Sequence, residues 1–356
     1  MNELAKSFSI VDQTSCILQR ILNERNISEE DLRKMMNLLL NNNKDLKNID
    51  SFLSAFLTGI SFLDLSSDDI SSLVDEILSK DKYIPYKNDL KDIDNIICVA
   101  GSGKKYHKTF NVTTFAAILA SGLGAKVVKP VSKGVTSKLG SGELLETLKI
   151  SAYSSMDNIY NQLRQQDICF VSIEKNIPTF DSIYGGRQLA ISPLSHVLPG
   201  LMSPIKCQHI YYGLSSSEHL KSLELFRKYG VLGNISVACS YYCGGFIDEL
   251  IIGPNSKLSI MDSDNQINEV KILEQISDKI EPINISSFSN EKRNVEYILQ
   301  TIDGGIINDY TKVIAINSAG ILITANVFSN LEEAYQASLN YIKNLKLSNR
   351  IKKLRK

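Results

Sequence analysis

The stretch "NIICVAGSGKKYHKTFNVTTFAAILASGLGAKVVKP", residues 95–130, decides the fold class. It opens with a short apolar segment that ends in glycines, as a strand does where it enters a turn. An apolar helical segment follows and stops at Gly124, because glycine commonly closes a helix. A second apolar strand then begins near residue 126. Strand, helix and strand in this order predict a βαβ unit with parallel strands.

The same alternation continues toward the C-terminus. We expect further strands at 167–173, 205–215, 234–242 and within 248–262, and helices at 141–150, 217–230, 290–303, 311–323 and 331–345. Alternating strands and helices are typical of an α/β domain, because each crossover helix covers a face of the sheet. We therefore predict an α/β domain with a mainly parallel central sheet over residues 86–356.

The N-terminal part of the chain has a different pattern. Residues 9–80 carry apolar side chains at helical spacing, and Ser28 precedes Asp31 by three residues, as in a helix cap. The sequence predicts three or four short helices here, followed by a lysine- and aspartate-rich connection at 79–94. We expect a small all-helical domain over residues 1–85, joined by later helices.

Composition argues against several classes of protein, among them zinc proteins and membrane-spanning proteins. The 356 residues carry a formal net charge of zero, so no overall charge favours nucleic acid or an anionic membrane. The six cysteines lack the paired spacing of a zinc site, and no apolar run reaches the roughly 18 residues that span a bilayer. The start lacks the profile of a signal peptide, and we expect a cytoplasmic protein. The basic tail at 346–356 is read as a solvated helix end, with a docking role as the alternative.

Two loops combine glycine, hydroxyl and lysine side chains at a strand end and a helix start. In the first, Gly101 and Gly103 permit close approach of an anion, and Asn111, Thr113 and Thr114 stand where helix N–H groups attract phosphate. The pattern matches neither standard nucleotide motif. Because ligands of open α/β sheets bind outside the strand ends, we expect both loops to bind one polyanion. The second loop contains the following residues: Lys129, Ser132, Lys133, Thr136, Ser137, Lys138 and Ser141.

A pair of neighbouring acids, Asp248 and Glu249, follows a glycine turn in "GGFIDELIIGP". Adjacent carboxylates near a diphosphate commonly hold Mg²⁺, which binds through one or two carboxylates and substrate phosphates. An accidental surface pair is the alternative. His107, inside the first loop, is a general acid, a phosphate contact or an exposed loop histidine. The histidines at 196, 209 and 219 have no partner in the sequence that assigns them a role.

The order "TFNVTT", "TSKLGSGELLETL" and "GGFIDELIIGP" resembles the anthranilate phosphoribosyltransferase family over nearly the full length. Members have a small helical domain clasping a larger α/β domain, and they are similar to one class of nucleoside phosphorylases. Asn294 and Asn317 also match family positions. The resemblance implies an enzyme that transfers phosphoribose from phosphoribosyl pyrophosphate to an acceptor with loss of pyrophosphate. It further implies Mg²⁺ and a homodimer.

The resemblance also implies site residues. Asp248 and Glu249 match the magnesium carboxylates, and Thr113 replaces a serine that touches the metal. No residue is assigned as a catalytic acid or base, because positioning and charge neutralisation dominate this reaction. The expected substrate-binding residues are Gly101, Gly103, Lys104, Lys105, Thr109, Asn111, Thr113, Thr114, Lys129, Ser132, Ser141 and Arg187.

The sequence departs from the family at both ends of this site. In "GSGKKY", Lys104 replaces a glycine and Lys105 replaces an aspartate, so cations stand where the family has none. On the acceptor side, Pro130 and Ser132 replace a histidine and an asparagine, and the family's carboxylate-binding arginine aligns near residues 192–193. A carboxylate binds poorly in a desolvated pocket without a guanidinium partner. We therefore expect an aromatic or nitrogenous acceptor other than anthranilate.

Two other functions remain open on the sequence alone. One is a pentosyl phosphorylase, which would use a nucleoside and free phosphate. The other is a non-catalytic protein that binds a sugar phosphate or nucleic acid, with "KKYHK" and the basic tail as its electrostatic surface. The phosphoribosyltransferase and the phosphorylase predict turnover, whereas the binding protein does not.

Overall fold

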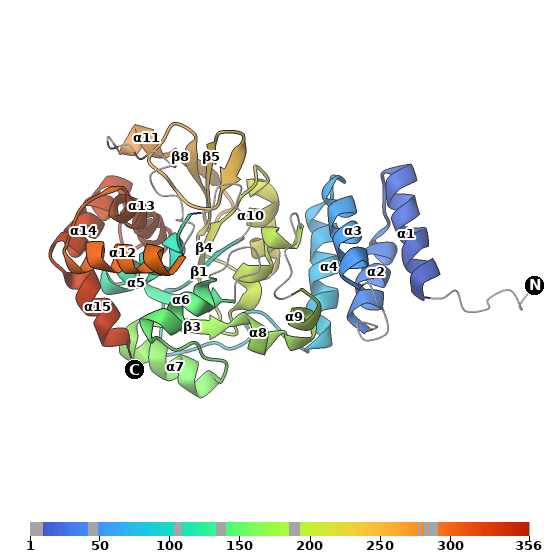
Figure 1. The fold of residues 1–356 in the computed structure, drawn as a ribbon, viewed down its shortest axis with the longest axis horizontal. Helices are drawn as coiled ribbons and strands as arrows, with labels where there is room; N and C mark the ends of the chain where they lie inside the picture. The colour runs from blue at the N-terminus through green and yellow to red at the C-terminus, as the bar shows by residue number, and fades with distance from the viewer. Residues whose placement is uncertain are drawn as a thin grey trace, which may run out of the picture. The chain divides into compact units, whose positions relative to one another are not determined.

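The computed structural model describes residues 10–41, 49–102, 109–132, 140–184, 193–276, 278, 280 and 291–355. Within them the chain forms two compact units. Unit 1 comprises Met1–Tyr83 and Asn176–Leu194, and unit 2 comprises Ile84–Lys175 and Ser195–Lys356. Figure 1 shows the helices and strands of both units.

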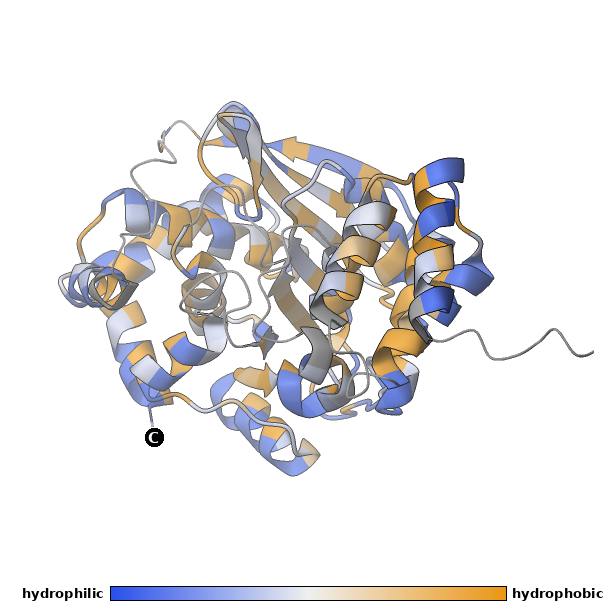
Figure 2. Ribbon diagram, turned by 45° about the vertical axis from the view of Figure 1, so that its right-hand side comes forward, coloured by the Kyte–Doolittle hydropathy of each residue, from blue (hydrophilic) through white to orange (hydrophobic). Residues whose placement is uncertain are grey.

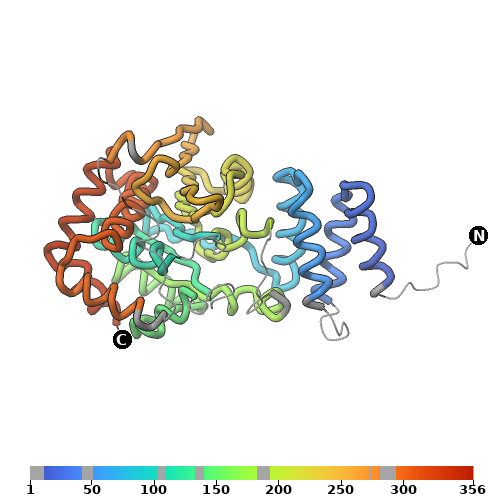
Figure 3. The backbone as a smooth tube through the Cα atoms, turned by 45° about the horizontal axis from the view of Figure 1, so that its top comes forward, coloured from blue at the N-terminus to red at the C-terminus, as the bar shows by residue number. Residues whose placement is uncertain are grey.

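Unit 1 is helical in its described part. Its helices are α1 (Ile10–Glu24), α2 (Glu29–Asn41), α3 (Ile49–Ser61), α4 (Ser67–Lys80) and α9 (Pro178–Tyr184). The first four lie side by side (Figure 3), as expected from their apolar stripes. The Ser28 hydroxyl accepts the Asp31 N–H, and Ser66 and Asp69 form a capping box at the start of α4. These caps satisfy N–H groups that the first helical turn leaves unpaired.

Unit 2 is built on one twisted sheet. Its strands are β1 (Ile96–Gly101), β2 (Lys126–Val131), β3 (Ile168–Ser172), β4 (His209–Gly213), β5 (Ile235–Tyr242), β6 (Gly245–Ile247), β7 (Ser256–Met261) and β8 (Ile267–Lys271). The order is β3-β2-β1-β4-β5-β7-β8, with β6 paired to β5. The five strands from β3 to β5 are parallel, and β6, β7 and β8 join antiparallel. The predicted α/β class with a mainly parallel sheet is confirmed.

Helices cover both faces of the sheet. They are α5 (Val112–Gly122), α6 (Ser141–Leu148), α7 (Met156–Gln166), α8 (Ile173–Asn176), α10 (His219–Lys228), α11 (Ile272–Gln275), α12 (Glu291–Asp303), α13 (Asp309–Thr324), α14 (Leu331–Lys343) and α15 (Lys346–Leu354), with short 3₁₀ helices at Pro193–His196 and Leu198–Met202. Because strand side chains alternate, Tyr211 reaches α13, whereas its neighbour Tyr212 packs against Phe226 of α10.

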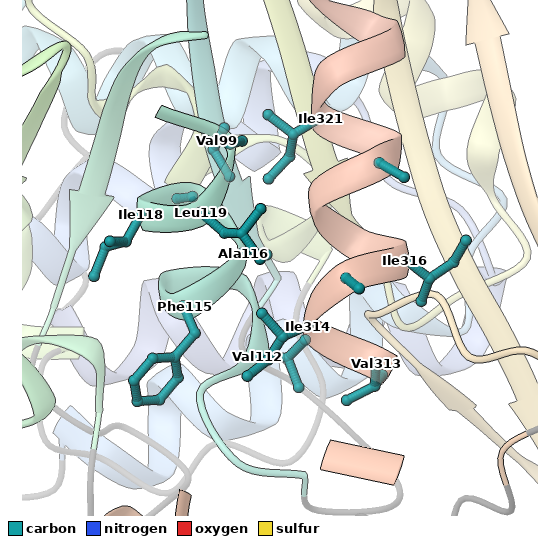
Figure 4. Close-up of a cluster of buried hydrophobic side chains, with 14 of the residues drawn as sticks. Val99, Val112, Phe115, Ala116, Ile118, Leu119, Val313, Ile314, Ile316 and Ile321 are labelled. Carbon is teal, nitrogen blue, oxygen red and sulfur yellow. The ribbon is translucent and has the colours of Figure 1, made fainter. Parts of the chain in front are cut away.

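A hydrophobic core of unit 2 lies between the sheet, α5 and α13. Figure 4 shows Val112, Phe115 and Ala116 of α5 beside Ile314 of α13 and Val99 of β1. Figure 2 shows hydrophobic residues concentrated on the central strands, while outer helices carry hydrophilic residues on their outward sides. Burial of α5 on nearly every side explains why its sequence is apolar almost throughout.

Three details differ from the sequence prediction. The apolar run "DELII" is a bend rather than a strand, and β7 begins only at Ser256. Strand β8 and helix α7 were not predicted. The basic tail forms α15, whose lysines at 346, 352 and 353 are exposed as expected, while Leu347 and Ile351 are buried. No described helix is both long enough and apolar enough to cross a membrane.

Candidate functional site

The candidate site lies at the carboxyl ends of β1 and β4, where the strand order reverses. From β1 the chain moves outward to β2 and β3, and then returns to place β4 on the other side of β1. Such a switch point leaves a crevice beyond the strand ends. Gly101 and Gly213 are paired at the last positions of the two strands, and Ser102 N–H donates to the Gly213 carbonyl at 2.8 Å.

The Asp248 backbone lies directly against these strand ends. A methyl group on Gly213 would stand 2.0 Å from the Asp248 carbonyl oxygen, and one on Gly101 would stand 3.4 Å from Asp248 Oδ2. Gly213 is therefore required by space rather than by its backbone angles. The Ser102 hydroxyl also donates to Asp248 Oδ2 at 3.3 Å. The predicted first loop and the predicted metal carboxylate thus meet at one place.

Glu249 is tied to the same loop. The Thr109 hydroxyl donates to Glu249 Oε2 at 2.9 Å. Asp248 and Glu249 are only 4% and 1% exposed, so the expectation of an accidental surface pair does not hold. Burial raises the pKa of the Tyr211 phenol well above its ordinary value, and the charges of Glu249 and then Asp248 raise it further.

The predicted helix-start residues lie where the sequence put them. Asn111 occupies the N-cap position of α5, and Thr113 and Thr114 lie in its first turn. The Thr114 N–H donates to the Asn111 carbonyl at 3.2 Å, and the Thr114 side chain is buried. Within the described residues, the Thr113 side chain makes no hydrogen bond to Asp248 or Glu249.

The second loop begins at the end of β2. Lys129 is buried within the strand, opposite Phe170 of β3. Ser141, the first residue of α6, accepts the Ser132 N–H on its hydroxyl at 3.2 Å, and the Gly142 N–H donates to the Ser132 carbonyl at 2.9 Å. These bonds hold the two ends of the loop together, so the two predicted substrate-binding residues Ser132 and Ser141 lie side by side.

Several predicted residues lie outside the described residues. They are Gly103, Lys104, Lys105 and Arg187, together with His107 and four residues of the second loop, Lys133, Thr136, Ser137 and Lys138. The expected contact between a lysine of "GSGKKY" and a diphosphate therefore stays a prediction.

The residues present fit a magnesium ion. Two buried carboxylates supply the hard oxygen donors that Mg²⁺ prefers. Among the described residues, no group of three or more His, Cys, Asp and Glu side chains is placed to hold a metal. Asp248 and Glu249 therefore suit a cation whose other ligands are water and substrate phosphate.

The three described histidines are structural groups. His209 Nε2 lies 2.8 Å from Asn95 Oδ1, and its Nδ1 accepts the Asn234 N–H at 2.9 Å. Burial lowers the pKa of His209, His196 and His219 to about 4, so all three rings are neutral at pH 7.

Sequence reasoning missed two residues of the site, Ser102 and Gly213. The only signal for Gly213 is a glycine ending the apolar run "HIYYG", which parallels Gly101 at the end of β1. Its spatial neighbour, Asp248, is far along the chain.

Comparison with known proteins agrees with this geometry. Residues 94–346 match the model of the glycosyl transferase family, a/b domain. The anthranilate phosphoribosyltransferase of Pelagibacter ubique is 25% identical over 347 residues, covering 95% of this chain and 98% of that protein. The enzyme of Bacillus cereus is 26% identical over 319 residues, covering 87% of each.

Solved structures share the fold. Anthranilate phosphoribosyltransferase from Saccharomyces cerevisiae, in complex with PRPP and Mg, has a TM-score of 0.71 at 18% identity, covering 95% of this chain and 96% of that one. The enzyme from Thermus thermophilus gives 0.70 at 14% identity, covering 95% and 98%. The chain therefore belongs to the anthranilate phosphoribosyltransferase family of glycosyl transferases.

Proposed function

We propose that the protein transfers phosphoribose from phosphoribosyl pyrophosphate to an aromatic or nitrogenous acceptor other than anthranilate. The observation that carries the proposal is the meeting of three segments at the switch point of the sheet. Gly101 ends β1 and Ser102 follows it, Thr109 precedes α5, and the buried pair Asp248 and Glu249 contacts both segments. Parallel strands converge on this edge, which is where α/β sheets bind phosphorylated ligands.

The donor half uses backbone and hydroxyl groups. The first turn of α5, with Asn111, Thr113 and Thr114, offers N–H groups and a positive dipole end to phosphate. Ser132 and Ser141 close the second loop around the start of α6, near the buried Lys129. In this proposal Gly103, Lys104 and Lys105 complete the diphosphate contacts. Together these groups fix the donor and bring positive charge to the departing pyrophosphate.

Asp248 and Glu249 would hold Mg²⁺, with Thr113 as the third residue assigned to the metal. When bound, the ion neutralises phosphate charge and so stabilises pyrophosphate as a leaving group. The protein holds the two carboxylates in place: Ser102 donates to one and Thr109 to the other. Little proton transfer is required, which agrees with the three described histidines being largely buried and neutral.

The acceptor proposal rests on residues at the carboxyl end of β2 and directly after it. Pro130 and Ser132 stand where the resemblance places a histidine and an asparagine, and Pro130 has no N–H to donate. Ser132 N–H is already engaged by Ser141. A carboxylate on the acceptor would need a fixed cation as its partner. We assign Arg187 to substrate binding in general, and not to an acceptor carboxylate.

A pyrophosphate-release assay tests the function. The protein is incubated with phosphoribosyl pyrophosphate and Mg²⁺, and with anthranilate or a panel of other aromatic amines, phenols and nitrogen bases. We expect release with a member of the panel and at most slow release with anthranilate. Efficient release with anthranilate would contradict the acceptor proposal alone. Binding without release for any acceptor would favour the non-catalytic function, and phosphorolysis of a nucleoside would favour the phosphorylase.

We also propose that the protein is a homodimer through unit 1. Leu22 on α1 and Phe62 after α3 are 74% and 81% exposed, which is unusual for large apolar side chains and is typical of an interface. Light scattering at micromolar concentration tests this, with dissociation expected for Phe62→Lys. A monomeric wild-type protein would contradict it.

A further inference from the structure

The segment Asp248–Ile251, which carries both carboxylates, is not part of a strand. A buried segment without ladder hydrogen bonds must find other partners for its backbone N–H and C=O groups. Here the partners are two buried side chains that come from distant parts of unit 2: Asn317 on α13 and Ser240 on β5.

The Asn317 side-chain amide bonds to both backbone polar groups of Leu250. Its Oδ1 accepts the Leu250 N–H at 2.9 Å, and its Nδ2 donates to the Leu250 carbonyl at 2.8 Å. The same amide accepts the Tyr211 hydroxyl at 2.8 Å and donates to the Val313 carbonyl at 2.8 Å. All four hydrogen-bonding positions of the amide are used, so its orientation is fixed.

Ser240 holds the residues on either side of Leu250. Its hydroxyl donates to the Glu249 carbonyl at 2.7 Å and accepts the Ile251 N–H at 3.0 Å. It also lies 2.6 Å from the Ser256 hydroxyl. Three consecutive residues after Asp248 are therefore held by side chains and not by a neighbouring strand.

This arrangement has a consequence for the carboxylates. In a regular strand, successive side chains point to opposite faces, so one of the two acids would leave the site. The bend instead lets Asp248 meet Ser102, which directly follows β1, and Glu249 meet Thr109, which precedes α5. Asn317 and Ser240 replace the ladder bonds that the bend gives up.

We propose that Asn317 and Ser240 are positioning residues that preset Asp248 and Glu249 for a divalent cation. The inference rests on the proposed function of this pair. Mg²⁺ demands near-ideal octahedral geometry, and loss of groups that orient its ligands typically lowers metal affinity about 10–100-fold. Asn317 and Ser240 bond to the backbone of residues 249–251, so each acts on the two carboxylates through that backbone.

Mn²⁺ titration followed by electron paramagnetic resonance tests the inference, with and without phosphoribosyl pyrophosphate. We expect Ser240→Ala and Asn317→Asp to raise the Mn²⁺ dissociation constant about 10-fold or more. Matched controls are Ser236→Ala on the same strand and Thr324→Val on the same helix. These two residues are fully buried and bond to each other at 2.7 Å, at a different place on β5 and α13. The controls should lose stability without losing Mn²⁺ affinity.

The outcomes distinguish failure of the positioning role of Asn317 and Ser240 from failure of metal binding by Asp248 and Glu249. If Ser240→Ala binds Mn²⁺ as tightly as Ser236→Ala does, at equal loss of thermal stability, the positioning role is wrong. If the wild-type protein binds no Mn²⁺, or binds it as well after Glu249→Gln, the metal role itself is wrong and the inference falls with it. Should Asn317→Asp fail to fold, Ser240→Ala alone decides.

Discussion

Replacing Gly213 by alanine tests whether the strand ends and the carboxylate segment form one rigid site. The new methyl carbon would stand 2.0 Å from the Asp248 carbonyl oxygen and 3.4 Å from Asp248 Cβ. A relaxed carbon–oxygen contact is about 3.3 Å, so one of the two backbones must move by roughly 1.3 Å. The atom in the way belongs to the backbone, so no side-chain rotation can relieve the clash.

The expected cost follows from this displacement. Overpacking a close-packed interior costs about 1–3 kcal/mol, and a misplacement of about 1 Å at a reacting centre costs roughly 100-fold in rate. We therefore expect Gly213→Ala to unfold at lower urea concentration and to release pyrophosphate about 100-fold more slowly. Circular dichroism measures the first effect, and initial rates at saturating Mg²⁺ measure the second.

Gly253→Ala is the matched control, because a methyl group there would meet only Ile251 at an ordinary 3.7 Å. It should stay within about 0.5 kcal/mol of the wild type, as substitutions away from special features usually do. Wild-type stability and rate in Gly213→Ala would refute the reasoning, since the Asp248 backbone would then not lie against β4.

Three further predictions concern single residues. Thr109→Val removes a hydrogen bond to the Glu249 carboxylate, worth about 1.5–3 kcal/mol. It should raise the Mg²⁺ concentration that gives half-maximal rate at least about 10-fold. Thr109→Ser keeps the hydroxyl and should leave that concentration unchanged. Gly320→Ala places a methyl group 2.7 Å from the Tyr211 ring and should cost about 1–3 kcal/mol in thermal unfolding; an unchanged midpoint would contradict this. The pKa of His209 is about 4 in the folded protein, below its ordinary 6.5. Between these two pH values the unfolded chain therefore binds more protons than the folded protein. Stability should fall from pH 7 to pH 5, and fall less in His209→Gln; equal losses would show that His209 is not the titrating group.

Local pattern accounts for the elements that the sequence predicted correctly. The glycine-ended strand at 96–101, the helix that follows and its closure before Gly124 all depend on residues that are close in the chain. The Ser66 cap of α4 is equally local. Such signals are complete within one turn of helix or one strand, so the sequence alone carries them.

Long-range contacts decide what the sequence left open. The run "DELII" has the composition of a buried strand, but its backbone bonds go to Asn317 and Ser240, so tertiary structure overrides the pattern. Gly213 is required by Asp248, a residue far from it in sequence. The proximity of Thr109 to Glu249 likewise depends on how the sheet brings strand ends together.

The central claim is that Asp248 and Glu249 hold a cation against the diphosphate of the donor. Calorimetric titration of the protein with phosphoribosyl pyrophosphate, with and without Mg²⁺, tests it most directly. The account predicts tight binding with Mg²⁺, weaker binding without it, and no effect of Mg²⁺ in the Asp248→Asn, Glu249→Gln double variant. Binding that is equally tight in all four titrations would contradict it.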